Sequence, residues 1–342
     1  MRNNYSPLVS IIITSYNREK YIGKAIESAL QQDYANLEVI VVDNCSADNT
    51  IELVQQYVND YRFRFIENET NIGMIRNFQK GIGLAKGDII SFVSSDDYLL
   101  NSSFISESVN LFNKHKNVVH VQGLAVTFTD NNNSFRPYSI DCYKKQVRSG
   151  REVFWESQYK ESPLGFDGCA IRASALKFID VCYDSKMNLL DVEIGLKLCL
   201  IGDIAYINKP CYAFRVHSNQ STQTYNDEML LANIAIIQRA SEVAIVKGAF
   251  ESNQMIEWSN NMVYKYIKSA YLKRYLQNFE KHKKFEALLI SKYPNIYTKL
   301  KREWKIVFLR FLYNPYYNLI KVLKFLSPKY YQIVYNLKEI GR

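Results

Sequence analysis

The sequence is poor in cysteine, and its cysteines form no recognisable pattern. Six are present in 342 residues, without a C-x-x-C pair and without the spacing of zinc ligands. A density this low excludes a small scaffold built on disulfides and predicts reduced thiols in a protein of the cytosol. The six are Cys45, Cys142, Cys169, Cys182, Cys199 and Cys211.

Long apolar runs and nucleotide-loop fingerprints are also missing. No stretch reaches the roughly 18 residues that a membrane-spanning helix needs. The basic start at Met1 and Arg2 leads into a short β-branched run that breaks at Thr14, which is not the pattern of a signal peptide. The glycines within residues 81–87 precede an expected strand instead of following one, so they indicate a helix end and exclude a P-loop or dinucleotide turn.

Acidic residues are scarce at one end of the chain. Residues 281–342 hold 14 Lys and Arg against 3 Glu, whereas the first 280 residues hold 29 basic against 31 acidic side chains. The net charge of +9 therefore belongs to the C-terminal region. The length allows one large domain, or a catalytic domain of roughly 220 residues with an appendage.

Apolar runs alternate with amphipathic segments over the first part of the chain. Residues 8–14 are rich in β-branched side chains, and apolar positions at helical spacing follow in residues 19–32. The alternation continues with strands expected at 37–42, 63–66 and 88–93 and helices at 47–58 and 72–85. This pattern predicts an α/β fold with a doubly wound, mostly parallel sheet.

Polar side chains follow three of these strands. They are Thr14 and Tyr16 after the first strand, Asp43 after the second, and Asp96 and Asp97 after the fourth. The carboxyl ends of parallel strands open on one rim, where we expect these side chains to meet. A ring can face a nucleobase, Asp43 can accept from the imide of uracil or thymine, and paired carboxylates can bind a divalent cation that neutralises a diphosphate. The alternatives are an Asp-Asp turn before a helix, and Asp43 as a helix cap.

Four segments resemble those of family 2 glycosyltransferases with the GT-A fold. They read VSIIITSYNRE, LEVIVVDNCSADNT and NIGMIRNFQKGIGLAKGDIISF, followed by SDD. The resemblance covers about the first 100 residues, and the four segments together are specific where each alone would be weak. It implies a Rossmann-like nucleotide-binding half, a nucleotide-sugar donor, a divalent metal (Mn²⁺ or Mg²⁺) and inversion at the anomeric carbon.

The resemblance also assigns roles near the SDD segment. Ser94 stands where the family often has a first acid. Asp97 is therefore expected to coordinate the metal, and Asp96 to contact the donor sugar or to support the metal site indirectly. Arg76, in the third segment, is a further donor-binding candidate. Asp43 and the habit of the family favour a UDP-sugar over a GDP-sugar.

Further candidates lie downstream. Asp167 is either an acceptor contact or part of a surface turn. Asp191 begins a helix, where its carboxylate either faces the cleft or caps the helix. The resemblance makes it the base that deprotonates the acceptor hydroxyl, while Glu193 projects from another side of that helix. Arg215 and His217 share one face of a strand. There the histidine can ligate the metal and the arginine can hold the diphosphate.

Beyond residue 221 the composition shifts to helices rich in Tyr, Lys and Ile. We expect a GT-A domain over residues 1–220, with a nucleotide-binding half at 1–100 and an acceptor-binding half at 101–220, and a helical, basic region at 221–342. Residues 299–335 combine an apolar stripe with basic positions, which favours an anionic membrane surface. The alternative is a helical bundle packed on the catalytic domain, and no nucleic-acid module accompanies the basic stretch.

These observations predict an inverting, metal-dependent glycosyltransferase. The expected acceptor is a saccharide linked to polyprenyl diphosphate, in the synthesis of a bacterial surface polysaccharide, and the expected place is the cytoplasmic face of the cell membrane. The chain has no Q-x-x-R-W segment, which disfavours a processive synthase. The alternative is a regulator or scaffold that binds nucleotide sugars without chemistry, motivated by Ser94. The presence of Asp96, Asp97, Asp191 and His217 disfavours it.

Overall fold

The computed structural model describes residues 6–128, 136–137, 145–159, 164–166, 168–181, 183, 189–217, 227–277 and 279–313. The chain divides into two compact units, Met1–Ser259 and Asn260–Arg342. The division falls within one long helix, α9 (Ser252–Gln277). Asp167 and residues 314–335 of the expected basic surface lie outside the described residues.

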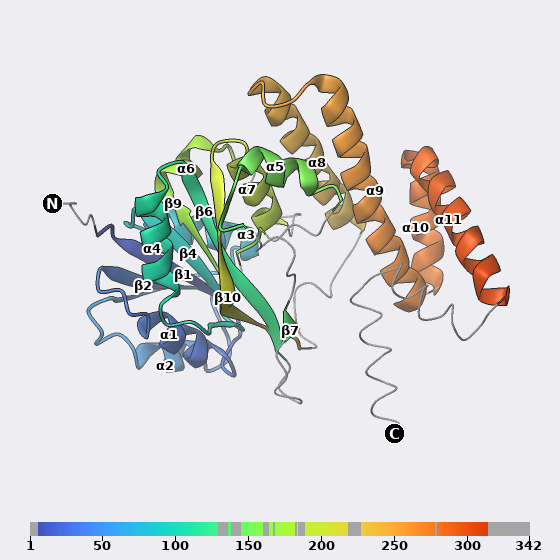
Figure 1. The fold of residues 1–342 in the computed structure, drawn as a ribbon. Coiled ribbons are helices and arrows are strands. Elements are labelled where there is room, and N and C mark those ends of the chain that lie inside the picture. Colours follow the sequence, from blue (N-terminus) through green and yellow to red (C-terminus); the bar gives the residue numbers. More distant parts are fainter. Residues whose placement is uncertain are drawn as a thin grey trace. The chain divides into compact units, whose positions relative to one another are not determined.

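A single mixed sheet forms the centre of the first unit (Figure 1). In the described part of the chain its strands are β1 (Val9–Ser15), β2 (Leu37–Asp43), β3 (Phe63–Glu67), β4 (Ile89–Ser94), β5 (Tyr98–Leu99), β6 (Val118–Phe128), β7 (Arg136–Pro137), β8 (Val147–Arg148), β9 (Cys169–Arg172) and β10 (Asp203–Arg215). Their order is β3-β2-β1-β4-β9-β6-β10-β5, with β7 paired to β6 and β8 to β10.

Most of the long strands run in one direction. β1 pairs in parallel with β2 and β4, and β2 pairs in parallel with β3. β9 is antiparallel to both β4 and β6, while β6 and β10 are parallel. The register sets Ser15 opposite Asp43 and Thr14 opposite Ser94, so the ends of β1, β2 and β4 meet at one rim. The predicted fold class, a mostly parallel α/β sheet, is confirmed.

Helices cover both faces of this sheet. The helices of this unit are α1 (Ile22–Leu30), α2 (Thr50–Gln55), α3 (Met74–Leu84), α4 (Phe104–Lys114), α5 (Gly150–Glu156), α6 (Ala173–Phe178), α7 (Leu190–Cys199) and α8 (Asp227–Val246), of which α8 packs on α7. Alternate β1 side chains such as Ile11 and Ile13 share a core with α1 and α4. Ile12 points to the other face and meets α3. Successive strand residues project to opposite faces, so one apolar run serves two layers.

Helix α3 lies close to the sheet at Gly81. A Cβ atom at this position would come within 2.6 Å of Cγ2 of Ile12, and Gly81 is buried. The absence of a side chain therefore sets how closely α3 packs on β1 and β2. This packing fixes the first turn of α3 above the carboxyl ends of the same strands.

In the second unit, α10 (Phe279–Lys292) and α11 (Pro294–Tyr313) pack together, and Tyr271 of α9 contacts Phe285 and Glu286 of α10. Buried Phe285, Leu289 and Leu300 form its apolar contacts. Lys268 pairs with Glu303 at 2.8 Å. These are the contacts of an ordinary helical bundle.

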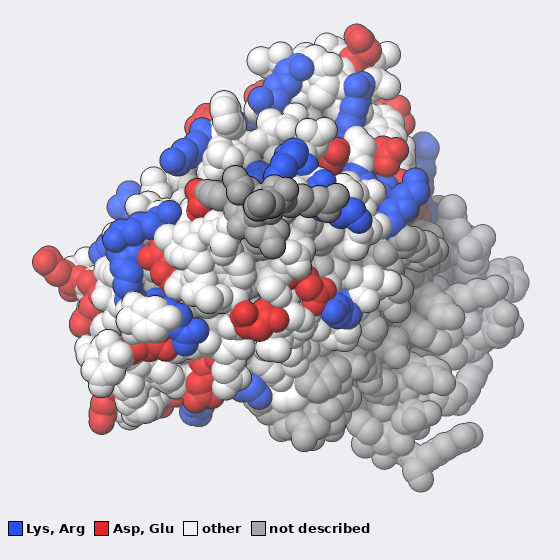
Figure 2. All heavy atoms as spheres, turned by 60° about the vertical axis from the view of Figure 1, so that its left-hand side comes forward, with Lys and Arg blue, Asp and Glu red and all other residues white. Residues whose placement is uncertain are grey.

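Charge and length bear on the membrane question in different ways. Of the helices that the structure describes, α8 is long and apolar enough to cross a membrane by length and composition, with 44 % of that stretch buried in the protein. Core helices pass the same test, so the indication is weak. On the face shown in Figure 2, basic and acidic side chains lie interspersed among uncharged surface, in keeping with the near balance of charge over the first 280 residues.

The close approach of α3 gives a test of the packing. Gly81→Ala should lower the free energy of unfolding by about 1–3 kcal/mol, because the new methyl group overpacks the helix–sheet contact. Gly83→Ala, in the same helix with no atom near the new Cβ, should raise it by about 0.5–1 kcal/mol through helix propensity. Urea unfolding of both variants measures the difference, and equal effects would contradict the close packing.

Candidate active site

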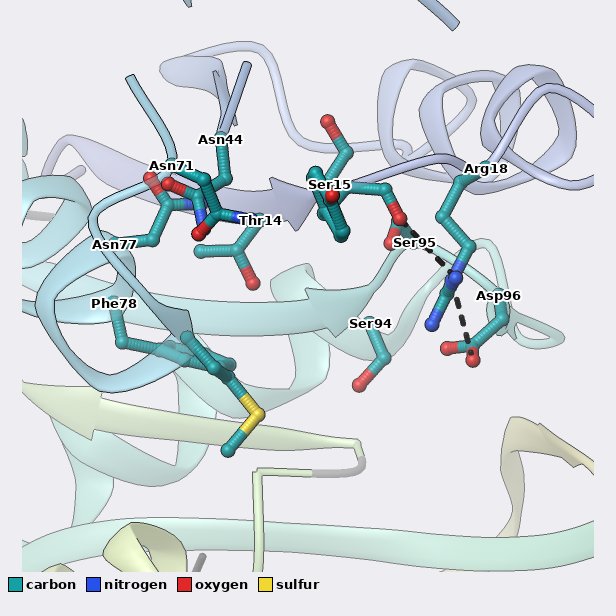
Figure 3. Close-up of a pocket in the computed structure, with 12 residues that line it drawn as sticks. Thr14, Ser15, Arg18, Asn44, Asn71, Asn77, Phe78, Ser94, Ser95 and Asp96 are labelled. Atoms are coloured by element: carbon teal, nitrogen blue, oxygen red, sulfur yellow. Dashed lines mark hydrogen bonds and ion pairs between the residues drawn. The ribbon is translucent and has the colours of Figure 1, made fainter. Parts of the chain in front are cut away.

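A cavity of about 260 Å³ opens at the carboxyl ends of β1 and β4 (Figure 3). Thr14 and Tyr16 reach it from the end of β1, and Ser94 and Asp96 from the end of β4. Tyr16 is 43 % exposed, so its ring is available to a ligand. The predicted meeting of strand ends therefore brings Thr14, Tyr16 and Asp96 to one cavity.

A second wall of the cavity consists of asparagine side chains that the sequence analysis did not single out. Asn44, Asn71 and Asn77 line it. The Asn44 amide donates to Oδ1 of Asn71 at 2.8 Å, and the Asn77 amide donates to the carbonyl of Val42 at 2.9 Å. Buried Asn68 joins them by donating to Oδ1 of Asn77 at 2.8 Å. This asparagine wall connects β2 to the start of α3, and its amides can both donate to and accept from a ligand.

The Asp43 carboxylate is fully buried and does not line the cavity. Its Oδ2 accepts hydrogen bonds from the Ser15 hydroxyl at 2.7 Å and the Ser46 hydroxyl at 2.6 Å, and its Oδ1 accepts from the Ser46 N–H at 2.8 Å. Asp43 thus ties the ends of β1 and β2 together. Arg76 is exposed on α3 and is also absent from the lining.

Asp97 is buried beside the cavity, with 2 % of its surface exposed. The Tyr212 hydroxyl donates to its Oδ2 at 2.9 Å, and the Arg215 backbone N–H donates to its Oδ1 at 2.7 Å. The Ser94 N–H in turn donates to the Tyr212 hydroxyl oxygen at 3.0 Å. The carboxylate expected to bind metal therefore fastens the turn after β4 to the end of β10.

Its neighbour Asp96 faces the cavity. Oδ2 of Asp96 lies 3.0 Å from Nε2 of His217, a residue 121 positions away in the sequence. A carboxylate oxygen and an imidazole nitrogen suit Mn²⁺, and Mg²⁺ commonly takes one or two carboxylates and completes its shell with phosphate and water oxygens. Within the described ranges no group of three or more His, Cys, Asp or Glu side chains could hold a metal. The pair thus fits a metal that shares its coordination with a diphosphate.

Arg215, at the end of β10, contacts the turn after β4 with its side chain. Its Nε donates to the backbone carbonyl of Asp96 at 2.9 Å. Its guanidinium carbon lies 4.8 Å from the ring centre of Tyr21 and 5.3 Å from that of Phe128, and the residue is 7 % exposed. The guanidinium therefore makes cation–π contacts with these two rings. Arg215, which we expected to hold a diphosphate, is not among the residues that line the cavity.

Asp191 lies in the first turn of α7 and is partly buried. Burial raises the pKa of its carboxyl to about 6, against a lowering by the backbone N–H of Val192. Glu193 is completely buried and forms an ion pair with Lys197 at 2.8 Å. Of the two acids, Asp191 is the one with exposed surface. It is not among the residues that line the cavity.

Comparisons with known proteins identify the family and the fold. Residues 10–179 match the model of Glycosyl transferase family 2. The chain is 34 % identical over 203 residues, 58 % of its length, to WcaA of Escherichia coli (strain K12), which is named for colanic acid biosynthesis and is covered over 67 %.

Two solved structures have a similar fold. S. aureus TarS 1–349 in complex with UDP-GlcNAc gives a TM-score of 0.65 at 21 % identity, covering 82 % of this chain and 79 % of that one. Mannosyltransferase PcManGT from Pyrobaculum calidifontis, in complex with GDP-Man and Mn²⁺, gives 0.53 at 16 % identity, with 96 % and 87 % covered. At these identities the structures speak for the fold, and the family follows from the sequence matches. The resemblance seen in the sequence is confirmed: the chain belongs to glycosyl transferase family 2 and is a glycosyltransferase of the EC 2.4 class.

Proposed function

We propose that this glycosyltransferase moves a sugar from a UDP-sugar to a saccharide acceptor, with inversion, in the synthesis of a bacterial surface polysaccharide. The observation that carries the proposal is a cavity lined by an exposed aromatic ring, Tyr16, and by Asp96, whose carboxylate lies 3.0 Å from the imidazole of His217. WcaA is named for polysaccharide biosynthesis, and TarS is seen with UDP-GlcNAc. Both support this choice of reaction.

Asp96 and His217 would hold the metal, Mn²⁺ or Mg²⁺. When bound, the metal supplies a Lewis acid that stabilises the negative charge of the departing diphosphate. This assignment differs from the expected coordination by Asp97, each of whose oxygens accepts a hydrogen bond from β10; coordination by Asp97 stays a prediction. Asp97 instead positions Asp96 by fixing the turn that carries both residues.

The nucleoside would lie between the Tyr16 ring and the asparagine wall. A uracil presents one N–H donor and two carbonyl acceptors, and the amides of Asn44 and Asn71 can serve both kinds of group. Asp43, sealed by Ser15 and Ser46, would act by fixing this rim. Direct acceptance from the uracil imide by Asp43 stays a prediction, as does donor binding by Arg76.

Asp191 would act as the general base. A pKa near 6 leaves its carboxylate ionised at neutral pH and close to the value at which a base is most effective. The carboxylate takes the proton of the acceptor hydroxyl as the hydroxyl oxygen bonds to C1 of the sugar. The bond from C1 to the diphosphate oxygen breaks, and the nucleoside diphosphate leaves with the bonding electrons. Glu193 is committed to its ion pair with Lys197.

The acceptor side rests on the sequence alone. We propose a saccharide linked to polyprenyl diphosphate, contacted by Asp167, with the basic C-terminal region holding the protein at the cytoplasmic face of an anionic membrane. The corresponding division of the chain is a GT-A domain over residues 1–220 and a helical region over 221–342.

A donor panel tests the reaction class. The full-length protein is mixed with UDP-glucose, UDP-galactose, UDP-GlcNAc and GDP-mannose, each with Mn²⁺ or with EDTA, and its melting temperature is measured. We expect a UDP-sugar to raise the melting temperature in Mn²⁺ and to lose most of this effect in EDTA, because metal and diphosphate share a site. Stabilisation by GDP-mannose alone would replace the uridine assignment, and stabilisation by none would contradict the proposal.

Replacing the proposed general base should lower kcat and raise the stability of the protein. Asp191→Asn should lower kcat by about a hundredfold or more while leaving the affinity for the donor unchanged. It should also raise the melting temperature at neutral pH. Because the folded-state pKa lies above the unfolded value, the ionised carboxylate costs stability, and this cost grows from about pH 4 to pH 6 and is fully present above.

The raised pKa of Asp191 also predicts the pH profile of the wild type. Below about pH 6 its kcat should fall roughly tenfold per pH unit as Asp191 is protonated. Glu193→Gln is the matched control for stability. It should lower the free energy of unfolding, in contrast to Asp191→Asn, because it breaks a buried ion pair with Lys197. Unchanged turnover in Asp191→Asn would remove it as the base.

The two adjacent acids are separated by measuring metal binding and stability together. Asp96→Asn should weaken Mn²⁺ binding in the presence of UDP by about tenfold or more with little change in unfolding. Asp97→Asn should lower the free energy of unfolding by about 1–3 kcal/mol, because it disturbs buried charge-assisted hydrogen bonds. If Asp97→Asn were as stable as the wild type and failed to bind Mn²⁺, Asp97 would be the metal ligand after all.

A further inference from the structure

We infer that Arg18 binds the diphosphate of the donor and stabilises it as the leaving group. The inference rests on the proposed nucleotide-sugar reaction and adds a residue to it. Of the described residues that line the cavity, Arg18 is the one with a basic side chain. Sequence reasoning had given the diphosphate to Arg215, whose guanidinium is enclosed by the rings of Tyr21 and Phe128.

The backbone presents Arg18 to the cavity through a tight turn after β1. Asn17 takes a left-handed conformation, with φ of 52°, and its side-chain oxygen accepts the Ala47 N–H at 2.8 Å. The Arg18 N–H donates to Oγ1 of Thr50 at 2.7 Å. Its Nη1 donates to the carbonyls of Tyr16 and Asn17, both at 3.1 Å. These two hydrogen bonds fix the Nη1 atom of the guanidinium against the turn that carries Arg18.

The Nε atom of the guanidinium faces Asp96. Arg18 Nε lies 3.6 Å from Asp96 Oδ2, the oxygen that also lies 3.0 Å from His217 Nε2, and Figure 3 shows the two side chains reaching into the same space. Both are partly exposed, with 23 % of the Arg18 side chain accessible. A phosphate held at Asp96 and His217 through a metal thus comes within reach of a guanidinium. Arginine suits this place because its planar fork binds phosphate oxygens in pairs.

The charge balance explains why a second cation is useful. A divalent metal held by one carboxylate leaves one net positive charge, which does not neutralise a diphosphate. The negative charge on the diphosphate also grows as its bond to C1 breaks. A fixed cation beside that bond is favoured more in the transition state than in the ground state, so Arg18 contributes to kcat as well as to donor affinity.

Binding of nucleotide and nucleoside separates this role from a structural one. Calorimetry measures UDP and GDP in the presence of Mn²⁺, and ligand-observed NMR measures uridine and guanosine, which lack phosphate. Arg18→Gln should weaken the nucleoside diphosphate that binds the wild type by about 10- to 100-fold and leave its nucleoside unchanged. Arg18→Lys should recover part of the loss. Lys20→Gln, which removes the same charge from an exposed neighbouring position, should change neither.

Titration with Mn²⁺ alone completes the test. The affinity of Arg18→Gln for Mn²⁺ should equal or exceed that of the wild type, because the variant keeps Asp96 and His217 and loses a nearby positive charge. Undiminished UDP binding in Arg18→Gln, or an equal loss of nucleoside, would overturn the inference while leaving the proposed function standing. Failure of the wild type to bind either diphosphate would overturn both.

Discussion

The buried carboxylate of Asp97 is the contact on which the site depends. It fastens the turn after β4 to β10 through the Tyr212 hydroxyl and the Arg215 backbone, and so joins parts of the chain more than a hundred residues apart. Burying a carboxylate is costly unless its oxygens are hydrogen-bonded, and here both are. The result is that Asp96, one residue earlier, is directed into the cavity opposite His217. The acid bonded to β10 thereby determines where the acid that lines the cavity lies.

The cavity separates charges that support structure from charges that face a ligand. Arg215 and Glu193 are buried, one against aromatic rings and a backbone carbonyl, the other in an ion pair with Lys197. Arg18 and Asp96 lie partly exposed at the rim. Buried charges cannot turn toward a substrate without losing the partners that stabilise them. Exposure together with incomplete enclosure is thus the better guide to function among residues of the same type.

Much of the fold was predictable, since β-branched runs and helical spacing are local properties of the sequence. The same holds for the rim, because Thr14, Tyr16 and Asp96 follow parallel strands, whose carboxyl ends meet at one edge of a sheet. The insertion of antiparallel β9 between β4 and β6 was not predictable from local pattern.

Which of two adjacent acids faces the cavity also depends on a partner strand far along the chain. Asp96 and Asp97 are adjacent residues of the same type. They differ in their partners, which are the Arg215 backbone N–H for Asp97 and the His217 ring for Asp96. Arg18 was missed for a similar reason. Its position follows from the left-handed turn at Asn17, which the spacing of apolar residues does not predict.

The asparagine wall has a consequence for how the protein responds to its surroundings. Asn44, Asn71 and Asn77 have no ionisable group, and the hydrogen bonds among them and Asn68 depend on neutral amides. The part of the cavity that would receive a nucleoside therefore keeps its character in acid and in base, whereas a carboxylic acid such as Asp191 does not. With Asp191 as the proposed base, acid would slow turnover without altering which nucleoside this wall favours.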